Sequence, residues 1–177
     1  MNTPDKTGKQ KEEPTMNRIS FAKIREGAVI PSKRDEDSDY DLYACFDEEE
    51  FVIPAFTTRL IPTGLISAFD KSLGVKFEER GSNTKWCGIV QAGVIDSGYR
   101  GEWVCAMYNG NPVPVHITKA VGEVQRLEDR VLVPYTKAIC QFHVRQIPET
   151  EICEITAEEI YAQSSERGAG KLGSSGK

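Results

Sequence analysis

The sequence is poor in the residues that build metal centres and disulfide frameworks. It contains only two histidines, and its five cysteines include no Cys-x-x-Cys pair. Zinc sites are commonly built from clustered histidine and cysteine side chains, so a histidine-built metal site is not expected. An odd number of widely spaced cysteines indicates reduced thiols rather than a disulfide scaffold.

Long apolar runs and excess positive charge are also missing. No apolar run approaches the length that spans a bilayer, and the polar N-terminal stretch lacks the apolar segment of a signal peptide, so we expect no membrane partner. The formal net charge of −5 argues against nucleic-acid binding, because phosphate backbones require basic surface. A small phosphorylated ligand stays compatible, since it needs only a local cluster of donors.

The composition that is present is typical of one globular domain with tails. The 177 residues are 39% hydrophobic and 28% charged, which is enough for a sizeable core. Residues 1–16 are polar, and we predict that they are disordered. We assign residues 17–162 to a folded β domain and residues 163–177, rich in glycine and serine, to a flexible C-terminal arm.

Short apolar segments alternate with turn residues along the predicted domain, which favours a β-sandwich, jelly roll or barrel. These segments are 18–24, 40–46, 51–55, 58–66, 74–78, 88–95, 103–109, 113–118, 130–134, 137–144 and 151–155. Only residues 157–163, after Thr156 as a possible N-cap, favour a short helix. The alternative for that stretch is a loop leading into the arm.

The stretch from Gly93 to Glu102 combines an acid and an aromatic residue on a tight turn. An apolar run ends on Asp96, a Ser-Gly pair turns the chain, and Tyr99 follows three residues after the acid. Flanking β-favouring residues predict a hairpin. An ordinary surface turn and part of a nucleotide pocket are both compatible with this pattern.

Four further stretches carry candidate chemistry, and each is also compatible with a plain structural role. An acid-rich turn at 37–44 could lie near a hydrated cation, and residues 79–83 place Arg80 and Ser82 where backbone N–H groups could cradle a phosphate. Gln141 ends an apolar run. The arm carries Arg167 among glycines and serines, whose amides can wrap an anion.

Taken in order, the five stretches resemble the five motifs of the trimeric deoxyuridine triphosphatase (dUTPase) family. Residues 93–101 match that family's GVID-x-x-YRG motif without exception, and residues 37–44 (DSDYDLYA) are similar to its DAGYDLYA. The remaining matches lie at 80–82, 139–141 and 167–176. The departures are Asp39 for a glycine, Gly81 for a serine, Lys171 for a glycine and Leu172 for the phenylalanine that stacks on uracil.

The resemblance implies an all-β, dUTPase-like jelly roll or β-barrel with a flexible C-terminal arm. It also implies a homotrimer whose active sites draw motifs from more than one chain. A cytoplasmic location is implied, or the host cytoplasm if the source is viral. The activity would be dUTP diphosphatase, which forms dUMP and pyrophosphate with Mg²⁺ on the triphosphate and limits uracil incorporation into DNA.

The resemblance also assigns roles to individual residues. Asp96 would be the catalytic base, and Asp41 would reach the Mg²⁺ through water. Backbone groups of Gly93, Val94 and Ile95 would pair with uracil, and Tyr99 would exclude a ribose 2′-hydroxyl. The phosphates would be held by Arg80, Gly81, Ser82, Gln141 and Arg167, and the ligand would be covered by Leu172, Gly173 and Ser174.

Two alternatives remain open from the sequence. A deoxycytidine triphosphate deaminase would need a glutamate three residues before Asn109, where this chain has Ala106. A dUTPase-like regulator would signal through nucleotide-dependent contacts with a protein partner. The segment between Asn109 and Gln141, which looks longer than in compact family members and is predicted to add a surface hairpin or loop around 119–129, could bind such a partner.

Overall fold

The computed structural model describes residues 17–169, and the chain divides into one unit that ends at Ile147 and a second that begins at Pro148. This division comes earlier than the boundary expected after Ala162. The expected disorder of residues 1–16 lies outside the described residues, as do Lys171, Leu172, Gly173 and Ser174.

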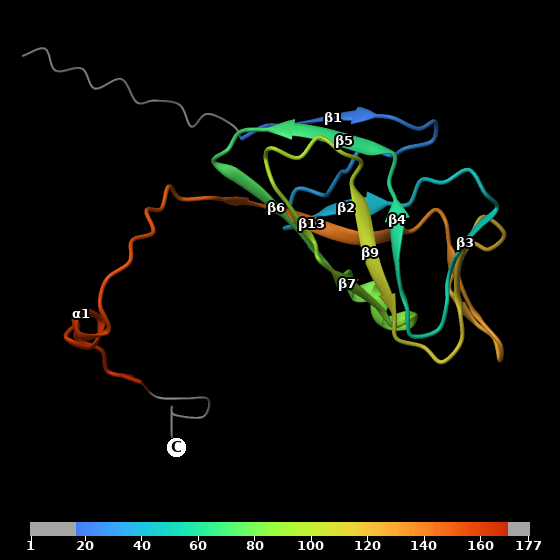
Figure 1. Cartoon of the computed structure of the whole chain (residues 1–177). Helices are drawn as coiled ribbons and strands as arrows, with labels where there is room; N and C mark the ends of the chain where they lie inside the picture. Colours follow the sequence, from blue (N-terminus) through green and yellow to red (C-terminus); the bar gives the residue numbers. More distant parts are fainter. Residues whose placement is uncertain (1–16, 170–177) are drawn as a thin grey trace, which may run out of the picture. The chain divides into compact units, whose positions relative to one another are not determined.

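The described part of the first unit is built from short strands in four sheets (Figure 1). The strands are β1 (Ile19–Lys23), β2 (Tyr40–Tyr43), β3 (Glu50–Ile53), β4 (Thr58–Pro62), β5 (Leu65–Phe69), β6 (Leu73–Glu78), β7 (Gly88–Gln91), β8 (Val94–Ile95), β9 (Val104–Asn109), β10 (Val115–Thr118), β11 (Gln125–Arg126), β12 (Val131–Pro134) and β13 (Ala138–Gln146). The sheet orders are β1-β5, β11-β12-β10-β3, β2-β13-β6-β8 and β4-β9-β7. The all-β jelly-roll prediction is therefore confirmed.

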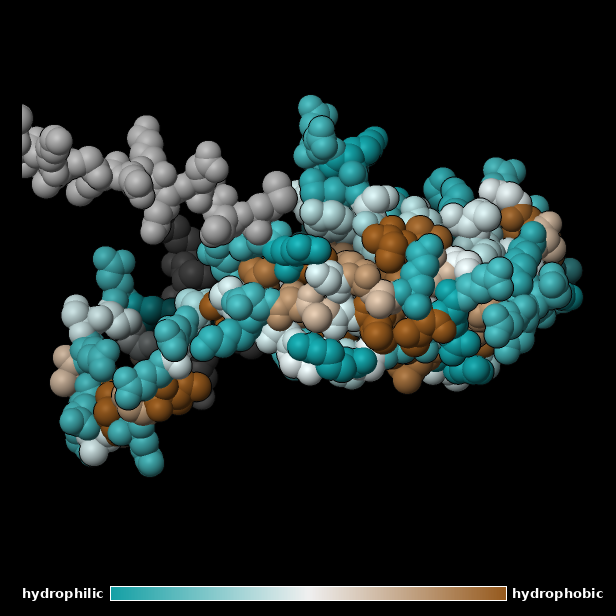
Figure 2. Space-filling view, turned by 90° about the horizontal axis from the view of Figure 1, so that it is seen from above, coloured by the Kyte–Doolittle hydropathy of each residue, from teal (hydrophilic) through white to brown (hydrophobic). Residues whose placement is uncertain are grey.

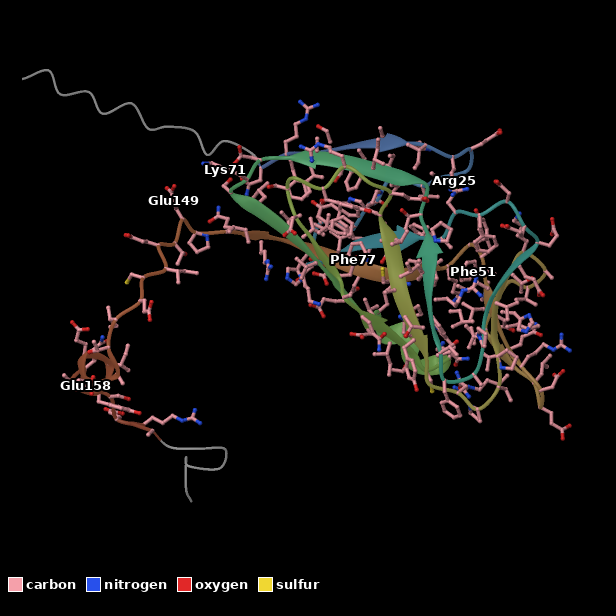
Figure 3. All side chains as sticks on the ribbon, in the orientation of Figure 1. Arg25, Phe51, Lys71, Phe77, Glu149 and Glu158 are labelled. Atoms are coloured by element: carbon pink, nitrogen blue, oxygen red, sulfur yellow. The ribbon has the colours of Figure 1, made fainter. Side chains whose placement is uncertain are left out.

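An aromatic cluster fills the space between the sheets. Trp103 is fully buried and packs edge-on against Phe142 and Phe21, with ring centroids 5.3 and 4.9 Å apart. Phe77 joins the same cluster at 5.6 Å from Trp103 (Figure 3). Such ring pairs stabilise a fold by about 0.5–1.5 kcal/mol each beyond the burial of their area. The indole N–H of Trp103 donates to Ser67 Oγ at 3.0 Å, so this buried donor is satisfied.

Two long predicted segments are each broken into two strands. The segment 58–66 divides into β4 and β5 at Gly64, whose φ of +68° suits glycine and whose added Cβ would lie 2.9 Å from Ala28 Cβ. The segment 88–95 divides into β7 and β8 at Ala92, which has a φ of 47°. In both places a left-handed residue turns the chain from one sheet to another.

The segment between β9 and β13 contains a crossover between parallel strands. Strands β10 and β12 pair in parallel, and parallel neighbours need a crossover connection rather than a tight turn. Residues 119–130 form this crossover. Within it, β11 pairs antiparallel with β12, which confirms the predicted surface hairpin.

The second unit contains one short helix among its described residues. Helix α1 (Ala157–Tyr161) begins after Thr156 with a capping box, in which the Glu159 N–H donates to Thr156 Oγ1 at 3.2 Å and the Thr156 N–H donates to Glu159 Oε2 at 2.8 Å. The predicted helix is confirmed, whereas the predicted strand at 151–155 is wrong. Ile152 within it is 93% exposed, because that stretch pairs with no strand of the described chain.

The face shown in Figure 2 is mostly hydrophilic, with separate apolar patches that include one on the second unit. No helix of the described residues is long and apolar enough to cross a membrane.

Candidate nucleotide site

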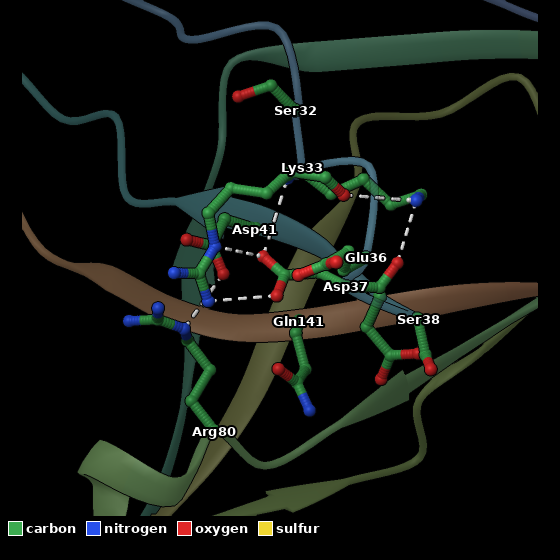
Figure 4. A pocket seen from close by; sticks show the side chains of 10 residues that line it. Ser32, Lys33, Glu36, Asp37, Ser38, Asp41, Arg80 and Gln141 are labelled. Atoms are coloured by element: carbon green, nitrogen blue, oxygen red, sulfur yellow. Dashed lines mark hydrogen bonds and ion pairs between the residues drawn. The ribbon is translucent and has the colours of Figure 1, made fainter.

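Sheet register brings together two residues that are 100 positions apart in the sequence. Strand β13 lies between β2 and β6, so that Gln141 faces Asp41 on one side and Glu78 on the other. Arg80 follows β6 by two residues, and its Nε lies 2.8 Å from Asp41 Oδ1 (Figure 4). The structure therefore brings Asp41, Arg80 and Gln141 into one site.

These three residues line a pocket of about 760 Å³. This volume falls within the usual range for small-molecule sites. The other lining residues come from the segment before β2. The lining comprises Ser32, Lys33, Arg34, Glu36, Asp37, Ser38, Asp39, Asp41, Arg80 and Gln141. It holds four acidic and three basic side chains, so its formal charge is slightly negative.

Two basic residues of this pocket were missed by the sequence analysis. Lys33 Nζ donates to the Asp37 carbonyl at 2.7 Å, and Arg34 Nη2 lies 2.9 Å from Asp37 Oδ1. The hydrogen bond from Arg34 holds the pKa of the Asp37 carboxyl below its usual value. The available signal was a Lys-Arg pair directly before an acid-rich run, because oppositely charged side chains three residues apart can form an ion pair.

A short 3₁₀ helix, η1 (Gly81–Lys85), carries the predicted phosphate cradle. Arg80 stands at its start with an extended backbone, and Arg80 Nη1 donates to Ser82 Oγ at 3.5 Å. The middle of η1 is fixed because the buried Asn83 donates from Nδ2 to the Ile139 carbonyl at 3.0 Å. An added Cβ at Gly81 would meet nothing within 4 Å, so the glycine leaves open space there.

The stretch 93–102 is a turn between sheets, so the prediction of a hairpin is wrong. Strand β8 pairs with β6, whereas β9 pairs with β4 and β7. The turn is closed locally, because the Tyr99 N–H donates to the Asp96 carbonyl at 3.0 Å and the Tyr99 hydroxyl donates to the Glu102 carbonyl at 3.0 Å. Asp96 itself is exposed at the end of β8.

Two glycines of this turn are required by close approaches. An added Cβ at Gly101 would lie 2.4 Å from the hydroxyl oxygen of Tyr99, so the ring covers the glycine. An added Cβ at Gly93 would lie 2.7 Å from Phe77 Cβ, and the Gly93 carbonyl accepts a hydrogen bond from the Phe77 N–H at 2.7 Å. Larger residues at either position would displace Tyr99 or separate β8 from β6.

The glutamate at the end of this turn holds it in place. Glu102 Oε1 accepts hydrogen bonds from the Gly64 N–H at 2.8 Å and from Arg25 Nε at 3.2 Å. Glu102 carries no local sequence signal for this role, because its partners lie 38 and 77 residues away.

Strand β8 is the edge of its sheet. Within the described chain its neighbour is β6 alone, so the backbone groups on its other side face no strand. The same sheet carries Asp41 on β2 and Gln141 on β13. The order β2-β13-β6-β8 places β8 and β2 at opposite edges of this sheet, so the structure of the single chain does not bring Asp96 or Tyr99 into the pocket lined by Asp41, Arg80 and Gln141.

The side chains of the pocket fit a metal ion that is bound by the phosphates of a nucleotide rather than directly by the protein. Among residues 17–169, no group of three His, Cys, Asp or Glu side chains is arranged to hold a cation. Asp41 is already engaged by Arg80 at 2.8 Å. Mg²⁺ commonly keeps several waters and binds through substrate phosphates, which such carboxylates could reach through water.

Comparison with known proteins identifies the family. A family model described as dUTPase matches residues 25–123, which is more than half of the chain and includes Asp41, Arg80 and the turn at 93–102. The chain belongs to the dUTPase family. The deoxyuridine 5′-triphosphate nucleotidohydrolase of Paraburkholderia xenovorans is 33% identical over 141 residues, which cover 77% of this chain and 81% of that relative.

Other proteins match different lengths of the chain. The Pol polyprotein of caprine arthritis encephalitis virus is 36% identical over 93 residues, which cover 52% of this chain but 8% of the polyprotein. Among solved structures, a mutant dUTPase of Staphylococcus bacteriophage 80alpha with dUpNHpp superposes with a TM-score of 0.72 at 19% identity and covers 92% of this chain and 100% of that one. This likeness supports the jelly-roll fold.

Within the family pattern, Arg167 lies in the second unit and is exposed. The sequence resemblance places it at the start of the fifth motif, of which residues 167–169 are described and residues 170–176 lie outside the described residues.

Proposed function

We propose that this chain hydrolyses dUTP to dUMP and pyrophosphate and thereby limits the incorporation of uracil into DNA. The observation that carries the proposal is the edge strand β8, which ends on the exposed Asp96 in the sheet that also carries Asp41 and Gln141. Backbone groups of Gly93, Val94 and Ile95 pair with the uracil edge. A site that hydrogen-bonds uracil leaves buried groups unpaired with cytosine, which discriminates strongly between the two bases.

Asp96 accepts a proton from the water that attacks the triphosphate. Arg80, Ser82 and Gln141 bind the phosphates, and Tyr99 lies against the deoxyribose. The pocket lining is slightly negative, so a highly charged triphosphate needs a cation beside it. Mg²⁺ would supply that charge when bound to the phosphates, and Asp41 would reach it through water.

The arm completes the site. Arg167 pairs with the outer phosphates, and Leu172, Gly173 and Ser174 close over the nucleotide. Ending the chain after Ala162 should cripple hydrolysis without unfolding the β unit. Full activity of the truncated protein, with an unchanged melting temperature, would show that the arm is idle.

The assembly is a homotrimer with shared sites. An uncharged face of the β4-β9-β7 sheet supports a contact between copies, since Leu60 and Ile89 are 60% and 47% exposed there. In register with them, Ala106 faces Leu60, and Tyr108 faces Ile89. Leu60→Asp should lower the mass measured by light scattering from trimer to monomer, whereas Lys76→Asp, outside this sheet, should leave it unchanged.

The test of activity is a pyrophosphate-release assay with each deoxynucleoside triphosphate, with and without Mg²⁺. Release from dUTP alone among the substrates, dependent on Mg²⁺, supports the proposal. Deamination of dCTP or the absence of any turnover would reject it.

A regulatory role is a second candidate. A similar phage dUTPase is described as controlling transfer of virulence genes by a proto-oncogenic G protein-like mechanism. In this chain the crossover at 119–130 exposes Leu127 (47%) on a hairpin, which is the surface that a protein partner would contact. Leu127→Asp should then abolish partner binding while dUTP hydrolysis persists.

A further inference from the structure

The crossover that contains β11 is attached to the phosphate cradle through one side chain. Arg126 donates from Nε to the Lys85 carbonyl at 2.9 Å, and Lys85 is the last residue of η1. The last carbonyls of a helix have no partner within it, and this interaction satisfies one of them.

The same guanidinium also contacts two other residues, one on the loop after β9 and one just after η1. Nη1 donates to the buried Asn111 Oδ1 at 3.2 Å, and Nη2 lies 3.4 Å from Cys87 Sγ. The planar fork of arginine presents donors on three nitrogens in fixed directions, so it reaches three separated acceptors, whereas the donors of lysine all lie on one nitrogen.

The segment held in this way is under local constraint. Cys87 has a φ of 51°, a conformation that costs free energy in any residue but glycine. Next to it, an added Cβ at Gly88 would lie 2.3 Å from the Trp86 ring. The backbone that leaves η1 therefore adopts a conformation that its own residues do not favour. Contacts from other segments of the chain must maintain this conformation.

Three outside contacts do so, one for each successive carbonyl. The Trp86 carbonyl accepts from Asn111 Nδ2 at 2.8 Å, and the Cys87 carbonyl accepts from the Gly110 N–H at 3.0 Å. Both of these partners lie on the loop after β9. The third partner, Arg126 on the Lys85 carbonyl, comes from the crossover, and it also orients Asn111.

We propose that Arg126 is a positioning residue for phosphate binding and that the crossover at 119–130 braces η1. The start of η1 carries Arg80 and Ser82, so a shift of its last residue moves the phosphate donors at its first turn. Arg126 does not touch the substrate. The proposal rests on the proposed dUTP hydrolysis, which supplies the phosphates that η1 binds.

Arg126→Ala should raise KM for dUTP roughly tenfold, which corresponds to about 1.4 kcal/mol, while kcat changes less than threefold. Arg130→Ala is the matched control, because Arg130 lies in the same hairpin but pairs with its neighbour Asp129 at 2.7 Å. Arg126→Lys keeps the charge and a long side chain but loses the fork, so it should give an intermediate KM.

Hydrogen–deuterium exchange provides a readout that is independent of activity. The peptide covering Gly81–Gly88 should exchange faster in Arg126→Ala than in Arg130→Ala, with the aromatic core unchanged. Equal KM values and equal exchange in Arg126→Ala and Arg130→Ala would overturn the proposal. If Arg126→Ala is globally unfolded, Arg126→Lys takes its place, and a normal KM in that variant would overturn the proposal. Absence of dUTP turnover in the unsubstituted protein would instead reject the proposed function, while the exchange comparison would still test the brace.

Discussion

The turn at 96–102 and the pocket at Arg80 share no lining residue in this chain; as the two walls of the proposed nucleotide site they are held by different forces. The turn at 96–102 is closed mainly by hydrogen bonds to backbone groups and by close packing, including the Tyr99 hydroxyl on the Glu102 carbonyl at 3.0 Å and the ring over Gly101, and one ion pair, Arg25–Glu102 at 3.2 Å, holds its end. The pocket wall is held by ion pairs, namely Arg80–Asp41 at 2.8 Å and Arg34–Asp37 at 2.9 Å. The turn is thus prearranged for the base and sugar, whereas the charged wall can exchange partners when phosphate and cation arrive.

The largest effect should come from the carboxylate at the end of β8. Asp96→Asn removes the proposed base, so hydrolysis should fall by about 10²–10⁴-fold. Binding of a non-hydrolysable dUTP analogue, measured by calorimetry, should stay within a few-fold. Asp39→Asn is the control on the other wall, since Asp39 lines the pocket without a proposed role in proton transfer. Near-normal turnover in Asp96→Asn would remove this residue as the base.

The steric nature of the turn can be tested with two of its glycines. Gly101→Ala places a Cβ 2.4 Å from the Tyr99 hydroxyl oxygen, whereas Gly98→Ala meets nothing within 4 Å. Moving the ring should reduce the preference for dUTP over UTP by roughly tenfold, because misplacement of a positioning group weakens selectivity. Ratios of kcat/KM for the two nucleotides measure this. The comparison fails if both alanine variants retain the same preference.

The electrostatic nature of the pocket wall predicts sensitivity to salt. Asp41→Asn removes the partner of Arg80, whose side chain is 29% exposed, and should raise KM for dUTP roughly three- to tenfold at low salt. Salt screens interactions between partly exposed charges. The difference in KM from the unsubstituted protein should therefore shrink at 0.5 M NaCl, where the Debye length is about 4 Å. The effect of Gly101→Ala should be the same at both salt concentrations. A salt-independent Asp41→Asn defect would contradict this division.

The smallest effect concerns the pH dependence of the charged wall. The pKa of Asp37 is lowered because Arg34 donates a hydrogen bond to its carboxylate. A lowered folded-state pKa stabilises the loop above the ordinary carboxyl pKa, and this contribution is lost as pH falls through the lowered value. Carboxyl ¹³C titration of Asp37 should show the low pKa, and Arg34→Ala should return it to the ordinary range. Asp129, whose pKa Arg130 lowers, should be unaffected by Arg34→Ala.

The sequence predicted most of the strands and the local order of the motifs, because alternation and turn residues act over short distances. It also predicted the Thr156 cap, since capping depends on neighbouring residues. It failed where the sheet partner decides the outcome. Flanking strands of the turn at 93–102 suggest a hairpin by proximity, yet β8 takes β6 as its partner, and β9 takes β4 and β7.

The site residues also divide into those with a local sequence signal and those whose role depends on distant partners. Asp41, Arg80 and Gln141 were recognisable from motif resemblance, although only the register of β13 shows that they meet. Arg126 carried no signal, because its partners at Lys85 and Asn111 lie 41 and 15 residues away. An arginine on a surface hairpin has the same local sequence whether it points to solvent or braces a helix.

The two tryptophans give this molecule a built-in optical probe of each wall. Trp86 lies buried at the exit of η1, and Trp103 lies buried directly after the turn that carries Tyr99. The chain contains no other indole. Replacing one with phenylalanine leaves a single emitter, so the fluorescence of each variant reports on one wall without an attached dye. Nucleotide-induced quenching could then be assigned to the phosphate side or the sugar side of the site by the indole that remains.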